Sequence, residues 1–291
     1  YLDETFSDKL ETEYVAGVDE NNVEQVLEDI IKAGADIVFC VGPQMMPNSL
    51  KVAVAHPEVY ILNCSLNAPH PYIRTYYGRM YEAKFLAGMI AGAVTDNERV
   101  AYIADYPIYG MIANINAFAL GVASVNPRAK VYLAWSKTKD YDRDKFLTEN
   151  DLHYVSDQDI ITPNDASRYF GLYKIQGDQT LNLAMPIWNW GVFYEKLLQS
   201  VLAGSYKAEG QEQVKALNYW WGMSAGVIDL ICSKHVPYGV KRLADHLKSD
   251  ITKGEIVPFF GQIYNQKGEL KNKGEHEMKP SDIMKMDWLV D

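Results

Sequence analysis

Short apolar segments alternate with amphipathic segments along the first half of the chain, and this alternation restricts the fold more than any other feature. Between residues 23 and 31 the apolar side chains recur at helical spacing, and Gly34 follows as a helix C-cap. The segment 36–41 (DIVFCV) comes next and is apolar after Asp36, which is typical of a parallel strand buried on both faces. A helical stretch at 48–55 and a strand at 59–63 repeat the order. The pattern predicts an α/β fold with a parallel sheet flanked by helices.

The same alternation continues after residue 78. The helix expected at 79–94 carries small residues at Ala83, Ala87, Gly88, Ala91 and Gly92, which predicts close packing in the interior. The further expected elements are the strand 99–104, the helix 112–122 and the strand 130–135. The polar turn at 95–98 precedes the first of these strands, and we expect the boundary between two lobes near this turn.

The second half of the chain continues with further strands and helices. The predicted strands are 159–162, 171–175 and 226–231, and the predicted helices are 192–202 and 238–251. The segment 258–291 is expected to form a β-rich cap, because residues 266–268 (QKG) are a hairpin turn signal.

Composition excludes several classes of protein. A chain of 291 residues is long enough for one large domain or two lobes. Its net charge of −10 argues against a nucleic-acid partner, which requires a basic surface. No apolar run approaches the roughly 18–20 residues that span a bilayer. The first ten residues lack the order of a signal peptide. The three cysteines are widely spaced, which predicts neither a disulfide framework nor a zinc site and favours buried thiols.

No convincing catalytic or cofactor motif is present. The chain lacks HExxH, a P-loop and G-x-G-x-x-G, and its six histidines are scattered. The string GMSAG at 222–226 has the spacing G-x-S-x-G, but we do not interpret it as the nucleophile elbow of a hydrolase. We therefore expect a binding protein that is not an enzyme and that uses no metal or cofactor. The enzyme alternative, for example a nucleoside hydrolase, would need an acid/base set or a metal in the cleft.

Candidate ligand contacts lie where the predicted strands end, because open α/β sheets bind ligands beyond the carboxyl ends of their strands. Aspartates there can accept hydrogen bonds from ribose hydroxyls, and aromatic rings can stack on a base. The alternative is that the same residue types only form turns. The segments concerned are 42–46, 64–65, 105–107, 162–165 and 177–178.

Two further features of the sequence, a pair of tryptophans and a glutamate in an apolar helix, each have two interpretations. Trp188 and Trp190 would point to one face of a strand, either as lobe packing or as a ligand platform. Glu82 lies in an apolar helix and needs partners, either Arg74 or Arg79 or the cleft.

The string YGRMYEAKFLAG at 77–88 resembles a conserved segment of the basic membrane protein family, the substrate-binding components of ABC transporters that take up purine nucleosides. The other resembling segments are 104–108, 115–121, 125–127, 188–191, 219–222 and 286–290. The resemblance implies a type I periplasmic-binding-protein fold of two α/β lobes. We expect residues 1–97 plus about 189–228 in lobe 1, and 98–188 plus about 229–291 in lobe 2. Compared with the family pattern, lobe 1 begins after the usual first βα unit.

The resemblance also implies a nucleoside site. Asp178 is the best match to a ribose-binding aspartate, although the segment between Thr162 and Trp188 is shorter than in typical relatives, and Trp188 stands where many relatives have lysine. The expected ligand-binding residues are Gly42, Gln44, Met45, Asp105, Tyr106, Pro107, Thr162, Asn164, Asp178 and Trp188.

The function implied is that of an extracytoplasmic component that closes two lobes on a small polar ligand, a purine nucleoside, and then docks on an ABC permease. Such a protein is membrane-anchored through a lipidated cysteine, which this sequence does not contain upstream of the domain. The alternative is a cytoplasmic sensor domain of a larger regulator, which unpaired cysteines would suit slightly better.

Overall fold

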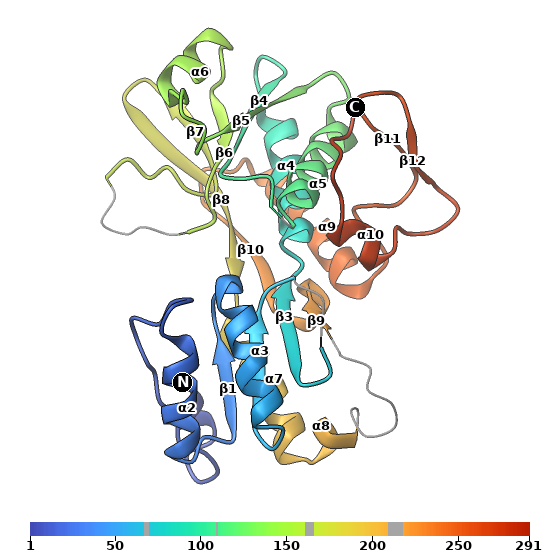
Figure 1. Cartoon of the computed structure of the whole chain (residues 1–291). Helices are drawn as coiled ribbons and strands as arrows, with labels where there is room; N and C mark the ends of the chain where they lie inside the picture. The colour runs from blue at the N-terminus through green and yellow to red at the C-terminus, as the bar shows by residue number, and fades with distance from the viewer. Residues whose placement is uncertain (67–69, 109, 161–165, 209–217) are drawn as a thin grey trace. The chain divides into compact units, whose positions relative to one another are not determined.

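A computed structural model describes residues 1–66, 70–108, 110–160, 166–208 and 218–291 (Figure 1). The chain divides into two compact units. Unit 1 comprises Tyr1–Gly78 and Asn189–Trp221, and unit 2 comprises Arg79–Trp188 and Gly222–Asp291. The chain therefore passes from one unit to the other three times, after Gly78, Trp188 and Trp221.

Unit 1 is built on a parallel sheet with strand order β1-β2-β3-β9. Its strands are β1 (Ile37–Cys40), β2 (Tyr60–Cys64), β3 (Ile73–Gly78) and β9 (Asn218–Trp221). Its helices are α1 (Leu2–Thr5), α2 (Val23–Lys32), η1 (Pro43–Met45), α3 (Met46–Ala55), α7 (Trp190–Leu202) and α8 (Ser205–Ala208). The strands and helices predicted between 23 and 63 are confirmed.

The two faces of this sheet are covered by different side chains. Val23 and Leu27 of α2 and Val52 of α3 pack with Ile61 and Ile73 of the strands on one face. The other face is aromatic. The ring contacts there join Phe39, Tyr76, Tyr219 and Trp221 of the sheet to Trp190, Phe193 and Tyr194 of α7. These three tyrosines and two tryptophans are thus explained by packing inside unit 1.

Unit 2 contains a six-stranded sheet with order β10-β8-β7-β6-β4-β5. Its strands are β4 (Arg99–Ala104), β5 (Lys130–Trp135), β6 (Tyr154–Ser156), β7 (Leu172–Gln176), β8 (Gln179–Trp188) and β10 (Ile228–Cys232). Its helices are α4 (Met80–Val94), α5 (Met111–Val125), α6 (Arg143–Glu149), η2 (Met223–Ala225), α9 (Tyr238–Lys253) and α10 (Pro280–Met284). Strands β5, β4 and β6 are parallel, whereas β7 is antiparallel to both β6 and β8, and β10 is antiparallel to β8. The predicted α/β class is confirmed, with an antiparallel half added to the second sheet.

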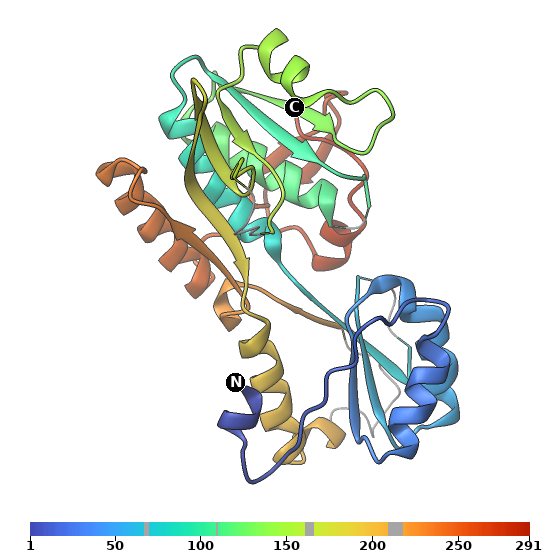
Figure 2. The ribbon, with the colours of Figure 1, turned by 90° about the vertical axis from the view of Figure 1, so that its left-hand side faces the viewer.

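Helices α4 and α5 lie side by side against one face of this sheet (Figure 2). They approach closely because Gly88 and Gly121 face the backbone of the other helix, where a Cβ atom would overlap a carbonyl oxygen of Phe118 or Phe85. The predicted burial of the helix at 79–94 is confirmed, since every residue from Met80 to Gly92 is buried. The opposite face of the sheet is covered by α6 and by the tyrosines around Tyr173.

The C-terminal segment contains the hairpin β11 (Gln262–Tyr264) and β12 (Leu270–Lys273), so the predicted turn at 266–268 is confirmed. Buried Asn116 of α5 ties the end of the chain to this unit. Its Nδ2 donates to the carbonyl of Trp288 at 2.8 Å, and its Oδ1 accepts from the N–H of Val290 at 3.0 Å.

Three details differ from the sequence predictions. The first division between units falls after Gly78 instead of near 97, because α4 packs on α5. The strand near 159 lies at β6 (Tyr154–Ser156), and residues 161–162 of the predicted strand lie outside the described residues. Trp188 ends β8 while Trp190 begins α7, so the two tryptophans do not share a strand.

Among the cysteines, Cys40 is buried and Cys64 and Cys232 are partly buried, and all three are free thiols. Burial raises the pKa of the Cys64 thiol to about 12. Cys64 is therefore a packing residue that stays protonated at neutral pH.

The Gly121→Ala substitution tests the close contact between α4 and α5. A methyl group there forces the helices apart, and we expect the free energy of unfolding to fall by about 3 kcal/mol in urea titrations followed by tryptophan fluorescence. Gly239→Ala in α9 is the matched control, because no atom lies within 4 Å of its Cβ position. That change should be neutral or gain up to about 1 kcal/mol. Equal stability of the two variants would contradict the account.

Candidate functional site

Four strands of unit 2 end at the same edge of its sheet. β4, β5 and β6 are parallel, and β8 runs in their direction because it is antiparallel to β7. The residues that end or follow these strands are 105–108, Ser136, 157–160 and Trp188, and we call this set the carboxyl edge of unit 2. Ligands of open α/β sheets bind at such edges.

Asp105 is the exposed carboxylate that follows β4. The hydroxyl of Ser136, which follows the adjacent strand β5, donates a hydrogen bond to its Oδ1. This contact orients the carboxylate while leaving it accessible to solvent. A carboxylate held in this way is suited to accept hydrogen bonds from hydroxyl groups of a ligand.

Large apolar side chains are exposed beside this carboxylate in the sequence and after the neighbouring strand. Tyr106 is 52 % exposed and Ile108 62 % after β4, and Ile160 is 65 % exposed after β6. Exposed apolar groups that gather around a few polar groups are typical of a small-molecule site. The edge therefore offers both an acceptor for hydroxyls and apolar surface for a flat ring.

The segment after β6 is held by Lys84 of α4. The ammonium group of Lys84 is buried and donates to Asp159 Oδ1 at 2.6 Å and to Ser156 Oγ at 3.2 Å. Burial raises the pKa of the Asp159 carboxyl, and the charge of Lys84 opposes this shift. Asp159 is thus engaged with the protein interior.

Asp157 is held from the other face of the sheet. Its Oδ2 accepts from the hydroxyl of Tyr173 at 3.0 Å, and that hydroxyl accepts from Arg143 at 2.8 Å. The Arg143 guanidinium lies 3.5 Å from the centre of the Tyr169 ring. Burial raises the pKa of the Asp157 carboxyl, and its hydrogen bonds to Gln158 N–H and Tyr173 oppose the shift. Asp105 is consequently the accessible aspartate of this edge.

The carboxylate of Glu82 in α4 has a hydrogen-bond partner and an ion-pair partner inside unit 2. Its Oε2 accepts from the N–H of Met223 at 2.7 Å, and Arg79 lies 3.6 Å from Oε1. Gly222 leaves room for this carboxylate, which a Cβ atom would displace. Of the two arginines proposed from sequence, Arg79 is the one that contacts Glu82. The contact fixes the turn through which the chain re-enters unit 2.

In unit 1, the segment after β1 contains the other predicted ligand residues. Buried Asn63 donates from Nδ2 to the carbonyl of Gly42 at 2.9 Å. The exposed side chain of Gln44 folds over Gly42, with Nε2 2.6 Å from the position a Cβ would take. Met45 is buried in the core with α2 and α3, so its side chain serves packing. Of the predicted ligand residues Gly42, Gln44 and Met45, Gln44 is the one that offers an accessible polar group.

In unit 2 the structure brings Asp105, Tyr106, Pro107 and Trp188 to one edge of the sheet. Thr162 and Asn164 lie outside the described residues.

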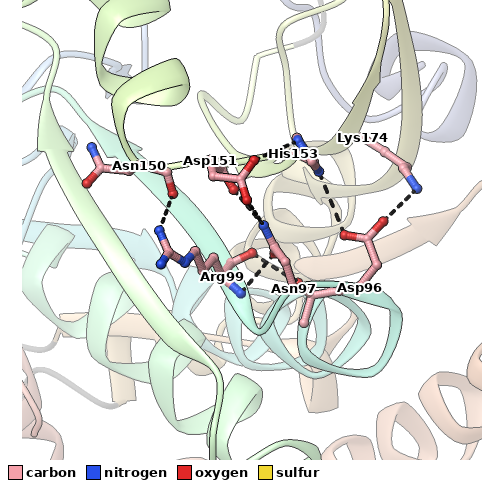
Figure 3. A network of polar contacts seen from close by, with 8 residues as sticks. Asp96, Asn97, Arg99, Asn150, Asp151, His153 and Lys174 are labelled. Carbon is pink, nitrogen blue, oxygen red and sulfur yellow. Dashed lines mark hydrogen bonds and ion pairs between the residues drawn. The ribbon is translucent and has the colours of Figure 1, made fainter.

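Asp178 is not brought together with this group. It lies in the turn of the β7–β8 hairpin, which projects from the end of the sheet where β4 and β6 begin. Figure 3 shows a polar network at that end, where Lys174 of β7 contacts Asp96 and His153 lies near Asp96 and Asp151. Asp178 instead lines an open hollow of about 290 Å³ with residues 166–169. The antiparallel course of β7 separates it from the carboxyl edge.

The sequence interpretation missed Ser136, Lys84 and the contacts that hold residues 157–160 at the carboxyl edge of unit 2. Lys84 carries a readable signal, since it is a charged residue inside an apolar helix, just as Glu82 is. Ser136 carried no signal, because its importance depends on the pairing of β5 with β4.

Among the described residues, no group of three or more histidine, cysteine, aspartate or glutamate side chains is placed to hold a metal ion. Within the same residues, no helix has the length and apolar character required to cross a membrane.

Solved structures share the fold of this chain. A solute-binding protein of an ABC transporter system from Conexibacter woesei covers 88 % of this chain and 90 % of its own, with a TM-score of 0.61 and 16 % identity. A transcriptional activator of the comK gene from Bacillus halodurans has a TM-score of 0.64 at 13 % identity, covering 83 % of this chain and 87 % of its own. At these identities the likeness concerns the fold.

The chain belongs to the Bmp family, described as ABC transporter substrate-binding protein PnrA-like, whose model matches residues 2–179. A purine-binding protein of Brucella abortus is 27 % identical over 99 % of this chain and 84 % of its own length. A putative ABC transporter glucose-binding protein of Haloferax volcanii is 29 % identical over 78 % of this chain and 59 % of its own length. The resemblance stated from the sequence is confirmed, and the family consists of solute-binding components of transport systems.

The Glu82→Gln substitution tests the buried carboxylate of α4. Burial raises the pKa of Glu82 above its ordinary value of 4.5, so the folded state binds this proton more tightly than the unfolded chain does. The stability contributed by Glu82 is therefore complete below pH 4.5 and is lost as pH rises through the raised pKa. We expect the variant to gain stability relative to the native chain as the pH rises, in urea unfolding between about pH 4 and about pH 7. If the difference in the free energy of unfolding between the variant and the native chain stays constant over this pH range, the pKa of Glu82 is not raised and this account of the buried carboxylate is wrong.

Proposed function

We propose that this chain is the extracytoplasmic substrate-binding component of an ABC transporter and that it binds a purine nucleoside by closure of two lobes. The lobes of this proposal are units 1 and 2. Membership of the Bmp family supports the transport role, a small-molecule ligand and a permease as partner. Substrate-binding proteins of ABC transporters are typically extracytoplasmic. We include a lipid anchor in the proposal.

The observation that carries the ligand class is the pairing of Asp105 with Ser136 at the carboxyl edge of unit 2, next to exposed Tyr106. A nucleoside has a hydroxyl-rich sugar and a flat apolar base, which suit the carboxylate and the ring. The two relatives differ in the ligand that their names give, a purine in one and glucose in the other. We favour the purine because the relative with that name matches 99 % of the chain.

Isothermal titration and thermal-shift measurements with several compounds test the ligand class. Guanosine, adenosine and inosine should bind, and ribose, glucose and uridine should bind much more weakly. A ligand at 100 times its Kd adds about 2.7 kcal/mol to the free energy of unfolding, which raises Tm by a few degrees. Binding of glucose without binding of any purine nucleoside would overturn the proposal, and so would the absence of any response.

Asp105→Ala tests the proposed role of this carboxylate. Loss of a charge-assisted hydrogen bond to the sugar should weaken guanosine binding by about 1.5–3 kcal/mol, roughly 10- to 150-fold in Kd. Tm of the free protein should stay nearly unchanged, because Asp105 is exposed. Asp178→Ala is the matched control at the opposite end of the sheet, and its Kd should equal that of the native chain. The reverse result would identify Asp178 as the sugar-binding aspartate.

A further inference from the structure

Lys84 is the most deeply buried charged side chain among the described residues. It lies in the middle of α4 with 1 % of its surface exposed. A buried ammonium needs partners, and Lys84 has several. Besides Asp159 and Ser156, it donates to the carbonyl of Asp157 at 3.4 Å, and Nζ lies 5.1 Å from the centre of the Tyr102 ring.

The hydrogen-bond acceptors of Lys84 all belong to one short segment, 156–159, where the chain leaves β6. The pairing of β6 with β4 ends at Ser156, opposite Tyr102. Beyond this point, the N–H of Asp157 donates to the carbonyl of Gly171, and the N–H of Gly171 donates to the carbonyl of Gln158. These bonds hold the backbone of residues 157 and 158. Among the described residues, the side chain of Asp159 has Lys84 as its hydrogen-bond partner, so the ammonium holds residue 159 in place.

This segment belongs to the carboxyl edge of unit 2, because β6 is the neighbour of β4 and Asp105 follows β4. We propose that Lys84 is a positioning residue for ligand binding: through Asp159 it holds residues 157–160 in the place from which they face the ligand. The proposal rests on the function proposed above, since it assigns Lys84 to the same site.

Stability alone is a poor reason for such a pair. Replacing a buried ion pair by apolar residues of similar volume is often neutral or stabilising, whereas removal of one partner is costly because it strands the other charge. An apolar pair would therefore fill the space between α4 and the exit of β6 at least as well. What the ion pair adds is one fixed position for Asp159, since a charge pair with additional hydrogen bonds is directional and apolar packing is not.

Three variants separate positioning from stability. Lys84→Met leaves Asp159 without its cation, and Lys84→Met/Asp159→Leu replaces the whole pair. Asn116→Ala is the control, because Asn116 is also a buried polar residue of unit 2 but holds the C-terminal segment instead. For each, Tm, the Kd of guanosine and hydrogen exchange of the amides of 157–160 are measured in the full chain.

Lys84→Met should lower Tm and weaken guanosine binding. The double variant should regain most of Tm, while its Kd stays about tenfold above the native value and the amides of 157–160 exchange faster. Asn116→Ala should lower Tm and leave both Kd and this exchange unchanged. A double variant with native Kd and native exchange would show that the pair serves stability only and would overturn the proposal.

The exchange measurement separates this proposal from the function on which it rests. If the native chain binds no purine nucleoside, the proposed ligand is wrong, and exchange in the free protein still decides the role of Lys84. Faster exchange at 157–160 in a double variant of native Tm supports positioning by Lys84, and unchanged exchange refutes it.

Discussion

Helix α4 buries two charged side chains, and two distant segments of unit 2 supply partners for them. Glu82 and Lys84 are two positions apart, so they leave the helix on different sides. Glu82 accepts a hydrogen bond from the N–H of Met223, where the chain returns to unit 2. Lys84 donates a hydrogen bond to Asp159, which follows β6. Because an unpaired buried charge costs several kcal/mol, both segments are held where these charges require them. Gly88 completes the arrangement by letting α5 pack closely on the same helix.

The candidate site is a consequence of strand direction. Three parallel strands and the aligned strand β8 end together, and they carry a hydroxyl, a carboxylate and exposed apolar side chains to one edge. Two of the three aspartates near this edge are engaged by the protein, Asp157 with Tyr173 and Asp159 with Lys84. Asp105 therefore differs from its neighbours in being both oriented and accessible.

The sequence predicted what depends on local pattern and missed what depends on long-range pairing. The parallel strands at 36–41 and 99–104 are apolar after their first residue, so they were recognisable, and the helix at 79–94 was recognisable as buried. Strand β8 was not predicted as an element, and its antiparallel pairing with β7 decides where Asp178 lies. The family followed from the segment at 77–88, whose glutamate, small residues and apolar residues the structure now explains by burial.

A crystal structure of the chain with bound guanosine would test the central claim most directly. The account predicts that the ribose hydroxyls lie within hydrogen-bond distance of Asp105 and that the base lies against Tyr106 at the carboxyl edge of unit 2. Guanosine bound at the β7–β8 hairpin beside Asp178, or bound away from the carboxyl edge altogether, would contradict it.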